Sequence, residues 1–299
     1  MSGGNGYTAI LTFTRPPERV VSLVPSLTES LFDLGAGQYL AGVTDYCRPP
    51  AEAEGRLRRV GGTRNPDVEA IRALKPELVI ANKEENSRRT VESLEAGGIK
   101  VWVTFPRSVD EALSLLWALV RLFNVPASGN RIRTLEVALE WERRAASQRT
   151  PVRVFAPIWQ GTTETGQTWW MTFNRDTYAH DVLSHCGGEN VFAGRERRYP
   201  MDADLGLAPP EEPGDRDTRY PRVMLAEVIE ASPELILLPD EPYAFGEREE
   251  AIVRELLAET PAVQADRVRR IDGSLLTWHG TRLARSLAEL PAVLQSASS

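Results

Sequence analysis

The chain has 299 residues, 42% of them hydrophobic and 26% charged, with a formal net charge of −7. This is the composition of a globular protein, long enough for two ordinary domains or one large one, and its acidic balance argues against a nucleic-acid partner. Its two cysteines, Cys47 and Cys186, are too few for a disulfide framework or a four-ligand zinc site.

The start of the chain reads "MSGGNGYTAILTFT" and lacks the basic stretch and apolar core of a signal peptide. The chain contains no run of about 18 apolar residues, so no membrane span is predicted. From these residues alone we expect a cytoplasmic protein, or an exported one whose leader has been replaced by this methionine.

The first predicted strand is the aliphatic run 19–24, which suits a buried parallel strand. Ser26 then stands three residues before Glu29, ahead of an apolar-periodic stretch, and this pattern predicts a helix that opens with a capping box. A helix cap alone would explain both residues. A helix N-terminus at the carboxyl end of a strand is also a place where ligands often bind.

A second unit follows in the phrase "NPDVEAIRALKPELVIA", residues 65–81. Its apolar residues have helical spacing up to Pro76, and residues 77–81 form a short apolar run typical of a buried strand. After a polar stretch, we expect a helix over 88–96 and a strand over 99–104. Strands that alternate with helices predict a parallel, three-layer α/β domain.

A long helix is predicted next. Residues 130–147 contain neither proline nor glycine, and Ile132, Leu135 and Leu139 are spaced to lie on one helix face. About 18 helical residues would span about 27 Å. We expect this helix to join an N-terminal α/β lobe, residues 1–125, to a C-terminal α/β lobe, residues 150–299, with residues 126–149 as a stiff connector.

The second lobe begins a new strand–helix series, with strands predicted over 152–157 and 268–271. Between them the earlier phrase returns as "YPRVMLAEVIEASPELILL", residues 220–238, and its inner proline lies 233 − 76 = 157 positions after the first. We therefore expect a helix–proline–strand unit at corresponding places in the two lobes. Residues 194–219, rich in proline, glycine and charge, form a long surface excursion, which is a mobile loop, a lid or a solvated insertion.

Catalytic patterns are scarce. The chain lacks a G-x-x-x-x-G-K-[ST] loop, a G-x-S-x-G elbow and an H-E-x-x-H helix, so we do not expect an enzyme. Of the three histidines, His180 and His185 are five positions apart, which is not the spacing of a metal pair on one helix face. Cys186 is expected to be a packed thiol at a helix end, and no metal site is predicted.

Aromatic residues follow several of the predicted strands. The carboxyl ends of parallel strands face a common crevice, where aromatic side chains would bind a large, flat, partly apolar ligand. For any single one of them, packing in the core is an equally good explanation. The residues concerned are Tyr46, Phe105, Trp159, Trp169, Trp170, Tyr243, Phe245 and Trp278.

Five stretches occur in the order found in one family: "RVVSLVPSLTESLFDLGAG", "LAGVTDYCRPP", "VGGTRNPDVEAIRALKPELVIA", "CGGENVF" and "YPRVMLAEVIEASPELILL". From about residue 19 to residue 290, the chain resembles the helical-backbone substrate-binding proteins of ABC importers, a group that includes cobalamin, haem and ferric-siderophore receptors. The resemblance implies two Rossmann-like three-layer lobes, a single long backbone helix that joins them and a ligand cleft between the lobes. It also implies a periplasmic or extracytoplasmic monomer that delivers a small metal-chelate ligand to the transmembrane subunits of an ABC transporter.

The segment "GVTDYCRPP" is most similar to the cobalamin-binding members, which implies cobalamin or a related corrinoid stacked between Tyr46 and Trp278. A haem or ferric-siderophore receptor stays open. In that case Arg64, Arg107 or Arg282 would meet carboxylates, and Tyr46 or His279 would ligate haem iron. We further expect ligand contacts from Arg64 and His279 and from the strand-end aromatic residues Phe105, Trp159, Trp170 and Tyr243.

In the transport family each lobe carries a glutamate seven positions before the inner proline, where it grips an arginine of the permease. Position 76 − 7 = 69 holds Glu69, but position 233 − 7 = 226 holds alanine, with Glu227 one place later. One step along a helix turns a side chain by about 100°, so Glu227 need not replace the missing glutamate fully. With the long excursion and the missing leader, this departure leaves a cytoplasmic corrinoid- or metal-cofactor-binding module, uncoupled from transport, as the alternative.

Overall fold

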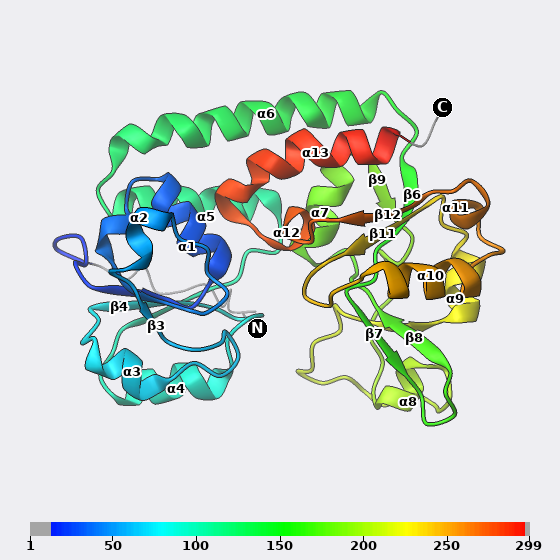
Figure 1. Cartoon of the computed structure of the whole chain (residues 1–299), viewed down its shortest axis with the longest axis horizontal. Helices are drawn as coiled ribbons and strands as arrows, with labels where there is room; N and C mark the ends of the chain where they lie inside the picture. Colours follow the sequence, from blue (N-terminus) through cyan, green and yellow to red (C-terminus); the bar gives the residue numbers. More distant parts are fainter. Residues whose placement is uncertain (1–12, 297–299) are drawn as a thin grey trace, which may run out of the picture. The chain divides into compact units, whose positions relative to one another are not determined.

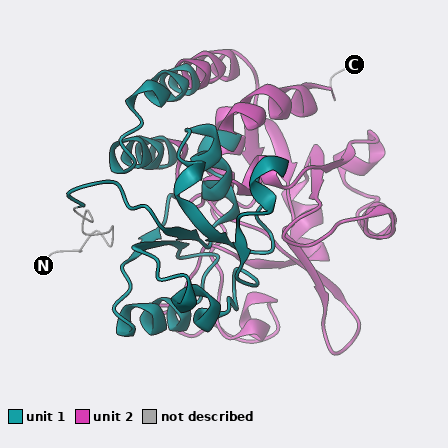
Figure 2. Cartoon of the chain, turned by 60° about the vertical axis from the view of Figure 1, so that its left-hand side comes forward, with its two compact units in different colours: residues 1–106, 110–136, 279–282 teal, residues 107–109, 137–278, 283–299 magenta. Residues whose placement is uncertain are grey.

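The structure is a computed structural model, and it describes residues 13–296. The chain divides into two compact units (Figure 2). The N-terminal unit comprises residues up to 106, residues 110–136 and residues 279–282, and the C-terminal unit comprises residues 107–109, 137–278 and those from 283 onward. The expectation about a signal peptide falls mostly on residues 1–12 and so lies outside the described residues.

The N-terminal unit is built on a five-stranded sheet. Its strands are β1 (Val20–Ser22), β2 (Leu40–Val43), β3 (Arg58–Arg59), β4 (Leu78–Asn82) and β5 (Val101–Thr104). All neighbouring strands are parallel, in the order β3-β2-β1-β4-β5. The two predicted apolar runs contain β1 and most of β4, and every residue of both strands is buried, as is typical of parallel strands covered on both faces.

Helices cover this sheet on both faces, as the alternating pattern predicted. They are α1 (Pro25–Asp33), α2 (Ala51–Glu54), α3 (Val68–Ala73), α4 (Arg88–Ala96) and α5 (Val109–Leu122), with the short 3-10 turns η1 (Gly37–Tyr39) and η2 (Pro126–Ser128). In Figure 1, α3 and α4 lie together on one side of the sheet, and α1 and α5 lie on the other. Ile71 of α3 and Leu94 of α4 pack with Val21 and Val79 of the sheet in one core.

The C-terminal unit has two sheets. A parallel sheet contains β6 (Val152–Phe155), β9 (Gly188–Asn190), β11 (Leu235–Pro239) and β12 (Val268–Ile271), in the order β12-β11-β6-β9. An antiparallel sheet contains β7 (Trp159–Thr162), β8 (Thr168–Met171) and β10 (Arg222–Met224), in the order β10-β8-β7. The sequence pattern did not predict the antiparallel sheet. Its Trp170 packs edge-on against Phe155 of the parallel sheet, so the two sheets share one core.

Several helices connect the strands of this unit. They are α7 (Tyr178–His185), α8 (Met201–Asp204), α9 (Leu225–Ala231), α10 (Glu247–Leu256), α11 (Pro261–Gln264), α12 (Ser274–Thr277) and α13 (Leu283–Gln295). The expected packed thiol is confirmed, because Cys186 caps the C-terminus of α7, is buried and is not in a disulfide. Burial raises the pKa of this thiol to about 12, so it stays protonated.

The predicted long helix is α6 (Gly129–Ser147), and Ile132, Leu135 and Leu139 form its buried face as their spacing indicated. Residues of α6 up to 136 belong to the N-terminal unit, and those from 137 belong to the C-terminal unit. The boundary between the units therefore falls inside this helix, whereas the sequence suggested boundaries at 125 and 150. None of the helices described between residues 13 and 296 is long and apolar enough to cross a membrane.

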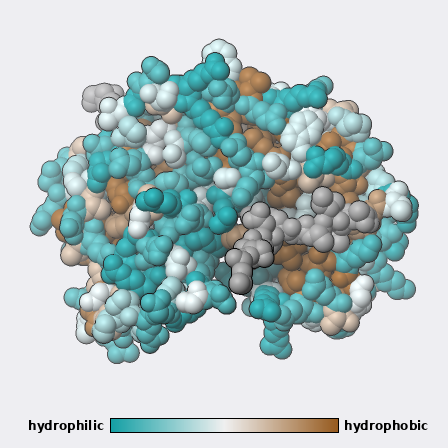
Figure 3. Space-filling view, turned by 180° about the vertical axis from the view of Figure 1, so that it is seen from behind, coloured by the Kyte–Doolittle hydropathy of each residue, from teal (hydrophilic) through white to brown (hydrophobic). Residues whose placement is uncertain are grey.

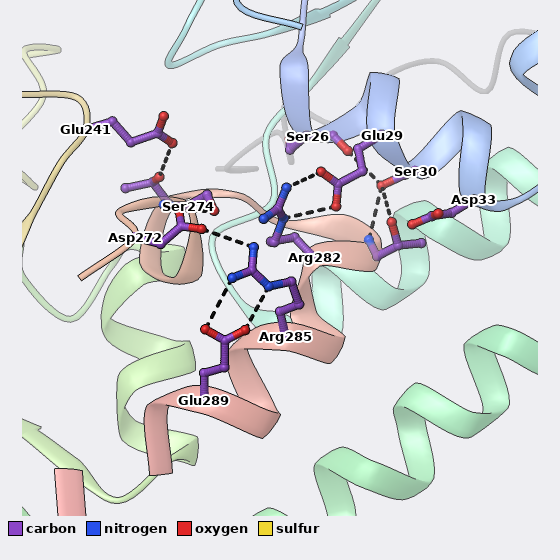
Figure 4. A network of polar contacts seen from close by, with 12 residues as sticks. Ser26, Glu29, Ser30, Asp33, Glu241, Asp272, Ser274, Arg282, Arg285 and Glu289 are labelled. Atoms are coloured by element: carbon purple, nitrogen blue, oxygen red, sulfur yellow. Dashed lines mark hydrogen bonds and ion pairs between the residues drawn. The ribbon is translucent and has the colours of Figure 1, made fainter. Parts of the chain in front are cut away.

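A short segment after α12 belongs to the N-terminal unit although its sequence neighbours do not. Residues 279–282 end in the turn η3 (Gly280–Arg282), which lies against α1 (Figure 4). The amide of Thr281 donates a hydrogen bond to Ser30 Oγ at 3.1 Å. Gly280 has a φ of 89°, and a Cβ at this position would lie 2.2 Å from Ser30 Oγ, so the close approach requires glycine.

The capping box expected at Ser26 and Glu29 is wrong. α1 begins at Pro25, and its N-cap residue Val24 makes no side-chain cap. Ser26 is buried, and its hydroxyl has no hydrogen-bond partner among residues 13–296. Glu29 instead forms a two-pronged ion pair with Arg282 (Figure 4). The fixed φ of proline starts this helix, and an arginine far along the chain takes the carboxylate that the box would have used.

The excursion is anchored by buried ion pairs. Asp204, at the end of α8, is fully buried, and its Oδ1 lies 3.1 Å from a guanidinium nitrogen of Arg195. Its Oδ2 accepts a hydrogen bond of 2.9 Å from the backbone amide of Arg222, and Arg195 also binds Glu227 of α9 at 2.9 Å. A buried carboxylate matched by arginines fixes this part of the chain to β10 and α9. These contacts favour a fixed insertion over a mobile loop for residues 195–204.

The two copies of the repeated phrase fold alike, as α3 followed by β4 and as α9 followed by β11. In each copy the residue before the inner proline has a φ of 47°. The glutamate after the proline accepts a hydrogen bond from the backbone amide of an arginine, and the Nε of that arginine donates to the carbonyl of the residue before the proline. These residues are Lys75, Glu77 and Arg19 in the first copy and Ser232, Glu234 and Arg153 in the second.

Candidate functional site

Tyr46 stands on a fixed loop of the N-terminal unit, directly after β2. Its side chain is 65% exposed. The backbone under it is held on both sides, because the Asp45 amide donates to the Gly61 carbonyl at 2.9 Å and Arg59 Nη1 donates to the carbonyls of Thr44 and Cys47 at 2.7 and 2.9 Å. An exposed aromatic ring on a rigid loop binds a flat ligand without a large loss of conformational entropy.

Cys47 supports the same loop from below. Its Sγ lies 3.1 Å from Thr28 Oγ1 and 3.2 Å from Thr44 Oγ1. Burial raises the pKa of the Cys47 thiol, although the two threonine hydroxyls act in the opposite direction. The thiol is therefore a packing and hydrogen-bonding group that joins the loop to α1. The sequence pattern gave no sign of this role, nor of that of Arg59.

His279 lies in a polar cluster at the carboxyl ends of β4 and β5. Its Nε2 is 3.4 Å from Asn82 Nδ2, and both side chains are buried. Asn86 accepts from the Asn82 amide at 2.7 Å and donates to the Leu23 carbonyl at 3.2 Å, so it joins the end of β4 to the chain after β1. Burial lowers the pKa of His279 to about 4, which keeps the ring neutral at neutral pH. The sequence pattern of residues 82–86 indicated only a polar loop.

Phe105 is half-buried just after β5, with the Lys83 ammonium 4.8 Å from its ring centroid. It lines a cavity of about 880 Å³ between β5 and α5, together with Phe13, Trp102 and Leu115. Phe13 to Pro16 form one wall, so this cavity is defined only for the chain from residue 13 onward. On the visible face in Figure 3, hydrophobic residues gather mainly on the side of the N-terminal unit.

The arginines considered for ligand carboxylates differ in their surroundings. Arg64 and Arg107 are exposed in loops. Arg282 is buried against Glu29, which already neutralises it. A buried arginine engaged in this way is a structural tie of η3 to α1, so we do not carry Arg282 into a ligand site.

The C-terminal unit brings two of the expected aromatic residues together. Trp159 follows β6 and is 46% exposed, and its ring centroid lies 5.3 Å from that of Tyr243, which follows β11. The Tyr243 ring in turn lies 4.8 Å from the buried ring of Phe245. The edge-on contact and the anchor beneath it hold Trp159 at the carboxyl ends of parallel strands, as expected for a binding surface.

Two other tryptophans are not on this surface. Trp170 is fully buried in the core, where its Nε1 donates to Gln160 at 2.9 Å. Alternate residues of a strand face opposite sides, and Trp170 sits on the core side of β8, so we leave it out of the proposed surface. Trp278 caps α12 and is almost completely buried. A stacking role for Trp278 would require its ring to become more exposed.

The glutamates considered for docking also differ. Glu69 lies on α3 with its side chain 81% exposed and a single local ion pair, to Arg72, at 2.7 Å. Glu227 lies on α9 with its side chain only 32% exposed, paired with Arg195. Its other oxygen lies 3.4 Å from the Met224 amide at the start of the helix. Among residues 13–296, no group of three or more His, Cys, Asp or Glu side chains is placed to hold a metal ion.

The chain matches the periplasmic binding protein family over residues 20–275. The vitamin B12-binding protein of Vibrio cholerae is 26% identical over 267 residues, which cover 87% of this chain and 83% of that protein. The vitamin B12-binding protein of Yersinia pestis is 32% identical over 192 residues, covering 62% of this chain and 63% of that protein.

Solved structures show the same fold. The crystal structure of the periplasmic vitamin B12 binding protein BtuF of Vibrio cholerae matches with a TM-score of 0.73 at 25% identity, covering 95% of this chain and 99% of that one. The apo form of the periplasmic haem-binding protein RhuT from Roseiflexus sp. RS-1 matches with a TM-score of 0.72 at 24% identity, covering 94% and 99%. The fold and the order of motifs thus confirm the resemblance to helical-backbone substrate-binding proteins, and the chain belongs to the periplasmic binding protein family.

Proposed function

We propose that this protein is the substrate-binding protein of an ABC importer and that its ligand is cobalamin or a related corrinoid. The observation that carries the proposal is the pair of exposed aromatic surfaces, Tyr46 on its fixed loop and Trp159 with Tyr243. Each follows parallel strands of its own unit. Large rings placed in this way suit a flat macrocycle, and relatives of this chain are named for vitamin B12.

Calorimetric titration with cyanocobalamin tests the proposal. We expect Tyr46→Ala and Trp159→Ala each to cost about 1–3 kcal/mol of binding free energy, a typical loss for a large aromatic contact. Trp141→Ala is the matched control, because Trp141 is an exposed tryptophan on α6 that is not part of either surface. If the wild-type protein does not bind, the corrinoid proposal is wrong. If all three variants bind equally well, the two surfaces are not the site.

Haem is the second candidate, because the exposed phenol of Tyr46 is free to approach a ligand and could coordinate its iron. His279 is less suited to this role, since its ring is buried beside Asn82. Tyr46→Phe separates the two ligands, because it keeps the ring and removes the hydroxyl. Loss of the haem absorption change in Tyr46→Phe, with cobalamin affinity retained, would identify haem coordination by Tyr46.

We also propose that the protein acts outside the cytoplasm, binds without catalysis and docks on a permease through Glu69. The exposed position of Glu69 on α3 supports docking, since an exposed carboxylate can meet an arginine of a partner without desolvating a buried charge. Glu227 supports it less, because Arg195 already holds its carboxylate. The alternative is a cytoplasmic binding module, and binding of the purified protein to membranes that contain the permease distinguishes the two.

A further inference from the structure

The antiparallel sheet of the C-terminal unit has a face that its core does not use. In the pairing register, Trp159 of β7 lies opposite Met171 of β8, which lies opposite Arg222 of β10. Cross-strand partners share a face, so these residues lie on the side opposite Trp170, together with Trp169. The face therefore carries an exposed aromatic ring and an arginine on strands that lie about 10 Å apart. In Figure 1, β7, β8 and α8 lie together at one end of this unit.

Arg222 is held against this face with part of its hydrogen-bonding capacity unused. Its guanidinium carbon lies 5.3 Å from the Trp169 ring centroid, and its side chain is only 13% exposed. One guanidinium nitrogen is 3.6 Å from Asp204. The Nε of Arg222 and the Nε1 of the almost fully buried Trp169 are buried donors that have no acceptor among residues 13–296. Buried donors without acceptors are costly and call for an explanation.

A second arginine comes from the excursion. The guanidinium carbon of Arg197 lies 4.8 Å from the Tyr199 ring centroid, and Arg216 covers the same ring at 4.3 Å. Arg197 Nε is also buried without an acceptor, and no carboxylate of residues 13–296 lies within ion-pair distance of Arg197. The backbone amide of Arg198, next to Arg197, donates to Asp204 Oδ1 at 3.0 Å, and Arg222 Nη1 lies 3.6 Å from Asp204 Oδ2, so the chain at Arg197 and the Arg222 side chain meet at the same carboxylate. Burial first, and then the charge of Arg197, lowers the pKa of Arg222.

The charges of this cluster do not balance. Three arginines, Arg195, Arg197 and Arg222, stand beside two carboxylates, Asp204 and Glu227. Arg195 binds both carboxylates, and Arg222 shares one of them, so Arg197 is the cation in excess. Like charges held together away from water are unfavourable in the free protein. An anion would accept hydrogen bonds from guanidinium and indole N–H groups that lack acceptors.

We propose that Arg197 and Arg222, with the Trp169 indole, form a subsite for an anionic group, a carboxylate or a phosphate. This inference rests on the proposed function, because the anionic group would belong to the macrocyclic ligand. That macrocycle would stack on Trp159, on the same face of the sheet. Cobalamin carries one phosphodiester and haem carries two carboxylates, so both offer such a group. The excursion then contributes a selective part of the binding surface.

A first test needs no macrocycle. Thermal unfolding is followed in inorganic phosphate and in citrate, each against sodium chloride at equal ionic strength. We expect at least one of the two anions to raise the midpoint of the wild-type protein and of Arg248→Gln, a control at an exposed arginine of α10. Arg197→Gln should lose this rise and, without an added anion, should unfold at a higher temperature than wild type, because the like charge next to Arg222 is gone. The inference would be overturned if neither anion raised the midpoint of the wild type. It would also be overturned if an anion raised the midpoint of Arg197→Gln as much as that of the wild type.

A second test separates the subsite from the proposed function. Affinities are measured for haemin, cobalamin and cobinamide, which is a corrinoid without the phosphodiester. Arg197→Gln should weaken whichever anionic ligand the wild type binds by about tenfold and leave cobinamide within about twofold, while Arg197→Lys should keep part of the affinity. Equal losses for cobinamide and cobalamin, or no loss for any bound anionic ligand, would contradict the subsite and leave the proposed function standing. Anion-dependent stabilisation without binding of any macrocycle would support the subsite and contradict the proposed function.

Discussion

The two copies of the helix–proline–strand phrase share a joint and differ in what their helices offer to the surface. In both copies a glutamate after the proline and an arginine at the start of the neighbouring strand or just before it close the same set of hydrogen bonds around a left-handed residue. The first helix then leaves Glu69 exposed, whereas the second commits Glu227 to Arg195 of the excursion. The repeated residues thus form the same helix–strand connection in both copies. Residues that are distant in sequence determine which copy keeps its helix glutamate exposed.

The largest expected effect comes from removing the arginine on which the second copy depends. In Arg195→Met, the fully buried Asp204 loses its main cation and Glu227 loses its partner. Deleting one member of a buried pair typically costs about 3–5 kcal/mol, and we expect the free energy of unfolding, measured with denaturant, to fall by that order. The matched change in the first copy, Glu69→Ala, removes an exposed pair and should cost about 0–1 kcal/mol. Similar losses in the two variants would contradict the comparison.

The next largest expected effect is a dependence of stability on pH, which arises where the first copy ends, at the carboxyl end of β4. His279 lies beside Asn82 at the end of β4, and burial lowers its pKa to about 4. An unfolded histidine takes up its proton near pH 6.5. The unfolded state therefore binds more protons between about pH 6.5 and pH 4, and stability falls as the pH drops through this window, by about 3 kcal/mol in all.

Denaturant unfolding at a series of pH values checks this prediction. His279→Gln should lose most of the dependence between pH 6.5 and pH 4 while keeping the part that comes from carboxylates. The end of β11 in the second copy has no histidine and instead has Asp240, which accepts from the Gly273 amide at 2.8 Å. Parallel pH profiles for wild type and His279→Gln would remove His279 as the cause.

A smaller effect should be the same in both copies. Lys75 and Ser232 each have a φ of 47°, a region that favours glycine over other residues. We expect Lys75→Gly and Ser232→Gly to stabilise the protein by up to about 1 kcal/mol, because relief of backbone strain slightly exceeds the added entropy of the unfolded chain. Ala231→Gly, one position earlier in the regular helix, should instead destabilise by up to about 1 kcal/mol. Opposite signs at Lys75 and Ser232 would show that the two joints are not equivalent.

The smallest effect on stability is expected for Glu69→Lys. The side chain is exposed, so the free energy of unfolding should change by less than about 0.5 kcal/mol, and ligand affinity should not change. Under the proposed function the same variant should bind permease-containing membranes more weakly, and added salt should weaken the wild type in the same assay. Uptake that is unaffected by charge reversal at both Glu69 and Glu227 would argue against transport.

Local signals predicted the regular parts of the fold. The helix over 88–96 and the strand over 268–271 have the expected bounds, and α6 starts one residue before the expected helix, because spacing, glycines and prolines act over a few residues. The repeat could be recognised for the same reason, since each helix–proline–strand unit is contained in one short stretch of sequence.

Long-range contacts account for what the sequence could not predict. β10 pairs with β8 about fifty positions earlier, and Trp170 is buried because this sheet packs on Phe155 of the parallel sheet. The expected capping box failed because Arg282, 253 positions away, binds Glu29. A similar limit applies to the proposed anion subsite, whose arginines come from the excursion and from β10. Side chains that meet only after the chain has folded leave no periodic pattern in the sequence.

The segment 279–282 has a consequence for how the protein is made. The N-terminal unit has most of its residues once position 136 has been synthesised, but Ser30 and Glu29 then still lack the partners that Thr281 and Arg282 provide. The ribosome adds about 5–20 residues per second, so the intervening 282 − 136 = 146 residues take roughly 7–30 s. During that interval the first half of the chain cannot reach its final form, and a fragment that stops at residue 136 would be a permanent version of this unfinished state.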